Sequence, residues 1–444
     1  MKEIFFIVII FLTQQGYSQD IAQKEGSTDD SNTIHNTGIK KGYLEDLNQL
    51  VDSIKTHHPQ PYEFITKSNF ELLVSEKQNE ISDSTTIRQF SWICNSISAA
   101  VGCLHTRTWA GNLFNLSPEI FFPLNASYVN SKLYITESHP SHNQLKKGVE
   151  ILKINEIDVI DLRKEIAAHI PTDGYNKKHT DARINASFSY FCGYKFDFAS
   201  HYTIEINVNG EQQEIILNRG IKYDSNNTPN SQSENLNFTI EPSDNIATIT
   251  IKSFVYYNER LPIFKSFIDR CFKQIELHSI ENVVIDLRGN GGGDPYCAVH
   301  LLQYISNRPF KYYKKEYALY YDDLTEDIKP FKNNYTGKLY VLINELCCST
   351  TGHLSSILKH NNIGILIGNE TGATYSCNAN TTNFTLENSQ INAYVATNTY
   401  QTHVSGFEKH RGVQPDHTIT KSLDDILNNK DLEMEKVMEL IRKK

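Results

Sequence analysis

The chain has 444 residues, of which 39% are hydrophobic and 21% charged, a composition typical of globular proteins. At about 100–200 residues per domain, this length predicts two or three domains. The 43 Lys and Arg residues against 52 Asp and Glu residues give a net charge of −9 without long charged blocks, so we expect no nucleic-acid partner.

Residues 1–18 predict a secretory signal peptide. A lysine precedes nine apolar residues, from Ile4 to Leu12, and the small residues Gly16 and Ser18 follow before a cleavage point. Nine apolar residues are too few to cross a bilayer, and no later run approaches that length. We therefore expect a secreted or periplasmic protein without an integral membrane span; a short membrane anchor is the alternative.

Cysteines and histidines are the candidates for disulfides and metal sites. Export permits disulfides, but eight cysteines allow 105 pairings, and free buried cysteines are an equally open alternative. The sequence has no Cys-x-x-Cys or His-Glu-x-x-His motif, so we expect neither a metal nor an organic cofactor.

Helical periodicity follows a polar, flexible lead over residues 19–42. Apolar residues recur at helical spacing in YLEDLNQLVDSIKTHHP, and a second helix is predicted from an N-cap at Asp83 or Ser84 to Gly102. These patterns predict an N-terminal helical domain over residues 43–118.

Short β-type runs dominate residues 119–222, with a hairpin turn at VNGE and one helix at DLRKEIAAHI. The stretch LKKGVEILKINEIDV (145–159) resembles a PDZ domain where that domain enters its central strands. The resemblance implies capture of an extended peptide at a sheet edge. A β-rich linker domain is the alternative.

A polar linker over residues 223–236 precedes alternating strands and helices over residues 237–430, which predict an α/β domain. Sites in such domains collect in loops after the carboxyl ends of strands. One such loop is DLRGNGGGDPY, in which Asp294 is suited to capping the next helix and Pro295 to its first turn. Its glycines let backbone amides approach an oxyanion or a phosphate. No Gly-Lys-Ser/Thr follows, which disfavours a phosphate-binding loop. A turn whose glycines serve the backbone geometry alone is the other alternative.

The second loop is ELCCSTTGHLSS (345–356), where Ser349 stands between a predicted strand and a predicted helix. A serine in this place is often a helix N-cap. As a nucleophile, Ser349 would form an oxyanion that the amide of Thr350 and a glycine-loop amide could hold.

A serine nucleophile requires a base. No lysine occurs between Lys359 and Lys409, and Lys359 is ten residues along the same helix, about 15 Å away. A lysine from the following strands is therefore excluded. Among the histidines, His105 in its post-helix turn is the best placed, although a structural role for this histidine is the alternative.

Five motifs in order, GCLHT, DLRGNGGG, LINE-x-x-x-S, IGNETGA and GVQPD, resemble the C-terminal processing (tail-specific) serine peptidases, most closely their tricorn-like branch. The resemblance covers residues 43–430. It implies a crotonase-like (ClpP/crotonase-type) α/β catalytic domain beside the N-terminal helical domain and the PDZ-like domain.

The resemblance also assigns roles to residues. It implies Ser349 as nucleophile, His105 as base, the amides of Gly292 and Thr350 as oxyanion donors, and Glu408 as the group that orients the base. Glu408 stands one position further from the final GVQPD motif than the family pattern requires.

We therefore expect a secreted serine endopeptidase that acts on polypeptides without a cofactor, in an oligomeric state that the sequence does not indicate. Departures from the family pattern around the histidine and the glutamate leave one alternative, a non-catalytic protein that binds peptides or apolar ligands on the same scaffold. An acyl-CoA hydratase or hydrolase is disfavoured because export would separate it from its cofactor.

Overall fold

The structure is a computed structural model that describes residues 38–111, 113, 117–220 and 235–443. The predicted signal peptide and nearly all of the predicted lead and linker lie outside the described residues. Within the described part of the chain, no helix is both long enough and apolar enough to span a membrane.

A six-stranded sheet forms the centre of the C-terminal part. Five of its strands run parallel, and the sixth, at one edge, pairs antiparallel with its neighbour. In spatial order the strands are β15 (His417–Thr418), β12 (Ile365–Gly368), β11 (Lys338–Ile343), β10 (Asn282–Asp286), β9 (Ile246–Ile251) and β8 (Leu236–Glu241).

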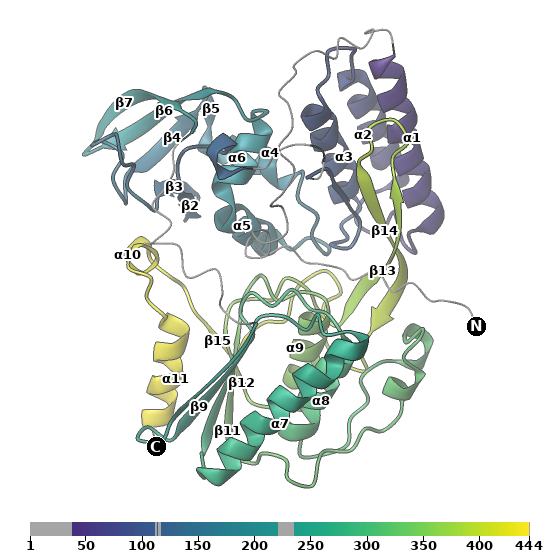
Figure 1. The fold of residues 1–444 in the computed structure, drawn as a ribbon, viewed down its shortest axis with the longest axis vertical. Helices are drawn as coiled ribbons and strands as arrows, with labels where there is room; N and C mark the ends of the chain where they lie inside the picture. Colours follow the sequence, from purple (N-terminus) through teal and green to yellow (C-terminus); the bar gives the residue numbers. More distant parts are fainter. Residues whose placement is uncertain (1–37, 112, 114–116, 221–234, 444) are drawn as a thin grey trace, which may run out of the picture.

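Helices cover both faces of this sheet (Figure 1). Side chains of β10 alternate between two cores: Val283 and Ile285 pack with the three connecting helices, whereas Val284 packs with the C-terminal helix. This alternation produces the predicted α/β layers. The connecting helices are α7 (Leu261–Leu277), α8 (Pro295–Ile305) and α9 (Thr350–Asn361), and the C-terminal ones are α10 (Leu423–Leu427) and α11 (Leu432–Arg442).

The middle part contains a second, antiparallel sheet whose inner face packs against three helices. The strands are β2 (Ala126–Val129), β3 (Lys132–Ile135), β4 (Glu150–Ile154), β6 (His201–Val208) and β7 (Glu211–Asn218), with β5 (Ile157–Asp158) paired to β4. The helices are α4 (Val159–Ala167), α5 (Lys177–Ala186) and α6 (Phe188–Lys195).

The N-terminal helices share their core with a hairpin that comes from the α/β part (Figure 1). Val395 and Leu386 of this hairpin are buried with Leu47, Phe90 and Ile97 of the helices. The N-terminal elements are α1 (Ile39–His57), α2 (Lys67–Glu80), α3 (Ile87–Ala100) and β1 (Arg107–Trp109), and the hairpin strands are β13 (Ser376–Thr385) and β14 (Asn392–Gln401). The hairpin therefore joins the first part of the chain to the last.

Several local expectations are confirmed and one is wrong. Asp294 caps α8 by accepting a hydrogen bond from the Tyr296 amide at 2.9 Å, with Pro295 in the first turn. The predicted cap of α3 is wrong: Thr86 is the N-cap, because it forms a capping box with Gln89 that neither Asp83 nor Ser84 could form. All eight cysteines are free and buried, so of the two alternatives, disulfides and free buried cysteines, the structure has the second.

Candidate active site

Ser349 adopts a backbone conformation that is rare outside glycine. Its φ of 50° and ψ of −125° place it at the start of α9, yet its side chain makes no capping hydrogen bond. Such a conformation costs about 1–3 kcal/mol, so the surrounding structure must impose it. The capping interpretation is therefore wrong, and the half-buried hydroxyl is left for another role.

The glycine loop lies directly against Ser349. A Cβ added at Gly292 would come within 2.7 Å of the Ser349 Cβ, 2.8 Å of the Cys348 carbonyl oxygen and 2.9 Å of the Thr350 nitrogen. Gly292 also has a φ of 103°, which side-chain-bearing residues rarely adopt. Only glycine permits this approach, so the two loops singled out in the sequence meet at the hydroxyl.

The two expected oxyanion donors differ in their present partners. Thr350 is the first residue of α9, where the helix itself offers no acceptor to the amide. The Gly292 amide, in contrast, donates to the Asn290 side-chain oxygen at 2.9 Å. The Thr350 amide is therefore the donor best prepared for an oxyanion, whereas the Gly292 amide would have to be shared.

His105 reaches the α/β part through the hairpin. It lies in the turn between α3 and β1, and β1 pairs with β14 so that Arg107 is opposite Tyr394. The Thr106 hydroxyl accepts a hydrogen bond from the Ala396 amide at 3.2 Å. Strand pairing thus fixes the histidine next to a segment almost three hundred residues later in the chain.

The start of β13 connects His105 with Ser349. The Cys103 sulfur lies 3.6 Å from the Asn378 carbonyl oxygen, and the same backbone group interacts with His105. The preceding residue, Cys377, makes a polar contact with the Ser349 side chain. Leu104 also packs against Cys348. The residues flanking the histidine therefore contact the residues flanking the serine.

Burial keeps His105 neutral. Desolvation lowers the pKa of His105 to about 4; the nearby charge of Arg107 lowers it further, and the Asn378 backbone opposes the shift. A neutral imidazole can accept a proton at neutral pH, as a general base must.

Asp173 is the carboxyl group that lies next to His105. One of its oxygens, a nitrogen of His105 and the sulfur of Cys103 all lie within 4.8 Å of one another. Burial raises the pKa of Asp173 to about 7, and the Leu104 amide, which donates to it at 2.8 Å, opposes the shift. Sequence reasoning missed this residue, because an aspartate in the polar stretch PTDGYNKK carries no catalytic pattern.

Helix α5 holds the Asp173 turn against the nucleophile loop. The Asn176 side chain donates to the Thr371 carbonyl at 2.7 Å, and a ring nitrogen of His179 lies 2.8 Å from the Glu345 carbonyl. These contacts bring a residue of the middle part next to the histidine of the N-terminal part.

Glu408, expected to orient the base, is exposed in the loop after β14. Its charge acts on Arg411, another residue of the same loop. The expected relay is not supported by this placement, because a carboxylate at the exposed surface is poorly placed to orient an imidazole that is buried.

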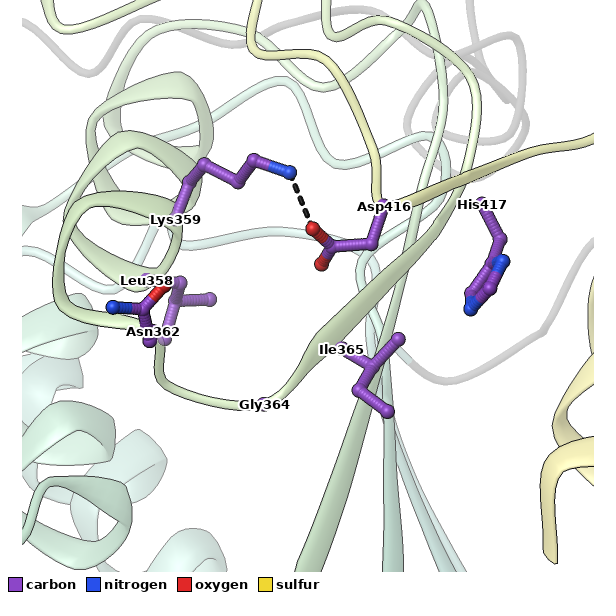
Figure 2. A pocket seen from close by; sticks show the side chains of 7 residues that line it. All are labelled: Leu358, Lys359, Asn362, Gly364, Ile365, Asp416 and His417. Carbon is purple, nitrogen blue, oxygen red and sulfur yellow. Dashed lines mark hydrogen bonds and ion pairs between the residues drawn. The ribbon is translucent and has the colours of Figure 1, made fainter. Parts of the chain in front are cut away.

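A cavity of about 270 Å³ lies at the far end of α9, lined by residues that include Lys359, Asp416 and His417 (Figure 2). Figure 2 shows Lys359 paired with Asp416. Ser349 precedes the other end of this 12-residue helix, about 18 Å away at 1.5 Å per residue. This cavity is therefore separate from Ser349, and Lys359 in its lining is paired with Asp416.

The sequence model of peptidase family S41 matches residues 245–419, which run from β9 to β15. Comparison with curated proteins gives no match. The chain is similar in structure to mature CPAF complexed with lactacystin, with 13% identity, a TM-score of 0.63, and coverage of 91% of this chain and 99% of that chain. A further structure of mature CPAF gives 13% identity, a TM-score of 0.62, and coverage of 91% and 97%.

At this identity, the likeness to CPAF concerns the fold alone, and it extends over the N-terminal, middle and α/β parts together. The family match concerns the part of the chain that contains Ser349 and Gly292. Residues 245–419 therefore match the model of peptidase family S41, and this match supports a serine-type peptidase.

Proposed function

We propose that this chain is an exported endopeptidase in which Ser349 attacks the scissile carbonyl of a polypeptide and His105 is the general base. As the bond from the serine oxygen to the carbonyl carbon forms, His105 takes the hydroxyl proton. It returns that proton to the leaving amine as the C–N bond breaks, and water then hydrolyses the acyl-enzyme. The observation that carries this proposal is the strained, uncapped Ser349 beside Gly292.

The negative charge that develops on the carbonyl oxygen would be held at the start of α9. The Thr350 amide lies at the N-terminus of α9, where the positive end of the helix dipole favours a negative charge. The Gly292 amide would share its hydrogen between Asn290 and the oxyanion. Loss of one such donor typically costs about 10²–10³ in rate, so both amides matter to the chemistry.

Asp173, rather than Glu408, is the residue that we propose to position His105. One Asp173 oxygen lies within 4.8 Å of a ring nitrogen of His105, so a small rotation or one water molecule is enough to connect the two groups. When ionised, the carboxylate would stabilise the imidazolium that forms during proton transfer.

The finer expectations about architecture and location are part of the same proposal. The layered parallel sheet with its connecting helices is compatible with a crotonase-like catalytic domain. The antiparallel sheet over β2–β7 is compatible with a PDZ-like domain that holds an extended peptide. Export is supported by the signal-peptide pattern of residues 1–18.

Labelling with a fluorophosphonate tests the nucleophile directly. We expect purified protein to be labelled on Ser349 and to cleave an unfolded protein substrate. Ser349→Ala should lose both properties, and His105→Gln should be labelled at least about 10²-fold more slowly, because a positioned base contributes about 10²–10⁴-fold. Equal labelling of the parent and Ser349→Ala would show that the nucleophile is another residue. A folded parent that neither labels nor cleaves would favour the alternative, a binding protein on this scaffold.

Asp173→Asn should reduce activity while it stabilises the protein at neutral pH. The asparagine oxygen keeps an acceptor for the Leu104 amide, which donates to Asp173 at 2.8 Å, but the side chain cannot ionise. We expect kcat/KM to rise near pH 7 in the parent, where burial places the pKa of Asp173, and this rise to vanish in the variant with a loss of about 10–100-fold.

The stability of the same variant follows from proton linkage. In the folded parent, Asp173 keeps its proton up to about pH 7, whereas the unfolded chain releases it near the ordinary value of 3.8. The parent therefore loses stability as pH rises from about 4 to 7, and Asp173→Asn should exceed it by about 1–3 kcal/mol above pH 7. Glu408→Gln is the matched comparison, and we expect it to keep its activity and the rise of kcat/KM near pH 7. If Glu408→Gln lost both while Asp173→Asn kept both, Glu408 would be the positioning residue.

A further inference from the structure

Three side chains around His105 combine sulfur, nitrogen and oxygen ligands in one buried place. Cys103 and His105 belong to the turn after α3, and Asp173 to the turn between α4 and α5. One ligand atom of each lies within 4.8 Å of the other two. The mechanism proposed above uses the histidine and the aspartate but has no role for the thiol.

We propose that Cys103, His105 and Asp173 form a binding site for Zn²⁺, and that the bound ion reversibly inhibits hydrolysis by occupying the base. The binding itself is independent of the proposed peptidase activity, whereas the inhibition rests on it. The proposal departs from the expectation of no metal, which rested on the absence of zinc-site motifs, because these three residues follow no such spacing.

The chemical types of the three ligands favour Zn²⁺ over Ca²⁺ and Mg²⁺. Thiolate, imidazole and carboxylate together suit Zn²⁺, which binds them at about 2.0–2.3 Å in tetrahedral geometry. Hard ions such as Ca²⁺ and Mg²⁺ prefer six or more oxygen ligands. Ligand atoms on a tetrahedral Zn²⁺ are separated by about 3.3–3.8 Å at those bond lengths, so any two of the ligand atoms need to approach each other by at most about 1.5 Å. Three protein ligands leave the fourth position to water.

The surroundings of Asp173 favour a cation. The Leu104 amide, from the residue between the other two ligands, donates to Oδ1 at 2.8 Å and so fixes the carboxyl group beside them. The second oxygen, Oδ2, is buried and has no hydrogen-bond partner in the described part of the chain. A buried carboxylate oxygen without a partner is costly, and a metal ion would satisfy it.

Protons must leave when the ion binds. Thiolate, carboxylate and neutral imidazole are the forms that coordinate Zn²⁺, so binding should release protons and become stronger as pH increases.

Metal binding can be measured on the full purified chain without any activity assay. Titration with Zn²⁺ in a calorimeter should give one site, and Co²⁺ in its place should give a sulfur-to-metal charge-transfer band. Cys103→Ser should lose that band and weaken binding by at least about 100-fold, since even the partners of metal ligands contribute about 10–100-fold. Cys94→Ser is the matched control, because Cys94 is buried in the same core but outside the cluster.

Asp173→Asn gives a second, independent variant in case Cys103→Ser fails to fold, and it should weaken binding by at least about tenfold. Zn²⁺ affinity unchanged in both variants, or a Co²⁺ spectrum without the charge-transfer band, would overturn the site. Inhibition is read separately: Zn²⁺ should slow fluorophosphonate labelling of the parent at least about tenfold more than that of Cys103→Ser. Binding without this slowing would overturn the inhibitory role, and binding by a chain that never labels would overturn only the peptidase.

Discussion

Replacing Ser349 with glycine should abolish hydrolysis and at the same time stabilise the folded protein. The hydroxyl is the proposed nucleophile, so its removal should lower kcat/KM by about 10⁴-fold or more. The backbone at this residue has φ 50° and ψ −125°, a conformation that costs a side-chain-bearing residue about 1–3 kcal/mol and that glycine adopts freely. We expect a net gain of about 1 kcal/mol in the free energy of unfolding, because glycine loses more backbone entropy on folding.

Ser349→Ala is the control that separates the two effects. Alanine also lacks the hydroxyl and should be equally inactive, but its Cβ keeps the strain, so the free energy of unfolding should stay close to that of the parent. Denaturant unfolding of the three proteins provides the comparison. Equal stability of the glycine and alanine variants would mean that the conformation of Ser349 stores no strain and would remove the main argument for a functional role.

Gly292→Ala should have the second largest effect. The added Cβ would lie 2.7–2.9 Å from atoms of Cys348, Ser349 and Thr350, so the nucleophile and the oxyanion donor would both have to move. A displacement of this size should lower kcat/KM by about 10²–10³-fold, the loss typical of one misplaced oxyanion donor. Steady-state kinetics should show the loss in kcat rather than in KM, because the affected interaction forms in the transition state.

Gly289→Ala in the same loop is the matched control. Gly289 has a positive φ of 81°, yet a Cβ added there has no atom within 4 Å. The control should therefore lose about 1–2 kcal/mol of stability through backbone strain while it keeps most of its activity. A loss of activity in Gly289→Ala equal to that in Gly292→Ala would attribute the effect to the loop as a whole rather than to the contact with Ser349.

The two loops of the site could be predicted, because residues adjacent in the sequence specify the backbone of each loop. A buried strand that runs into several glycines, and a serine between a strand and a helix, each specify their own backbone, and the parallel sheet brings both loops to one edge. The strand predicted before Ser349 and the helix predicted after it are observed as β11 and α9, and the absence of a nearby lysine predicts a histidine base.

The long-range parts could not be predicted. The strand β13, with the sequence SCNANTTNFT, is largely polar and was not expected, although its hairpin completes the N-terminal core. His105 acquires its position only when β1 pairs with β14, a contact without a sequence signal. Helix α2 was missed because only Phe70 is buried along it. Asp173 depends in turn on how α5 packs against the α/β part.

The crystal structure of the protein trapped with a fluorophosphonate would test the central claim most directly. We predict phosphorus bonded to the Ser349 oxygen, a phosphonyl oxygen about 2.7–3.1 Å from the Thr350 amide, and a ring nitrogen of His105 within about 3.2 Å of the Ser349 oxygen. An adduct on another residue, or an adduct on Ser349 with His105 turned away and out of reach, would contradict the proposed pairing of serine and histidine.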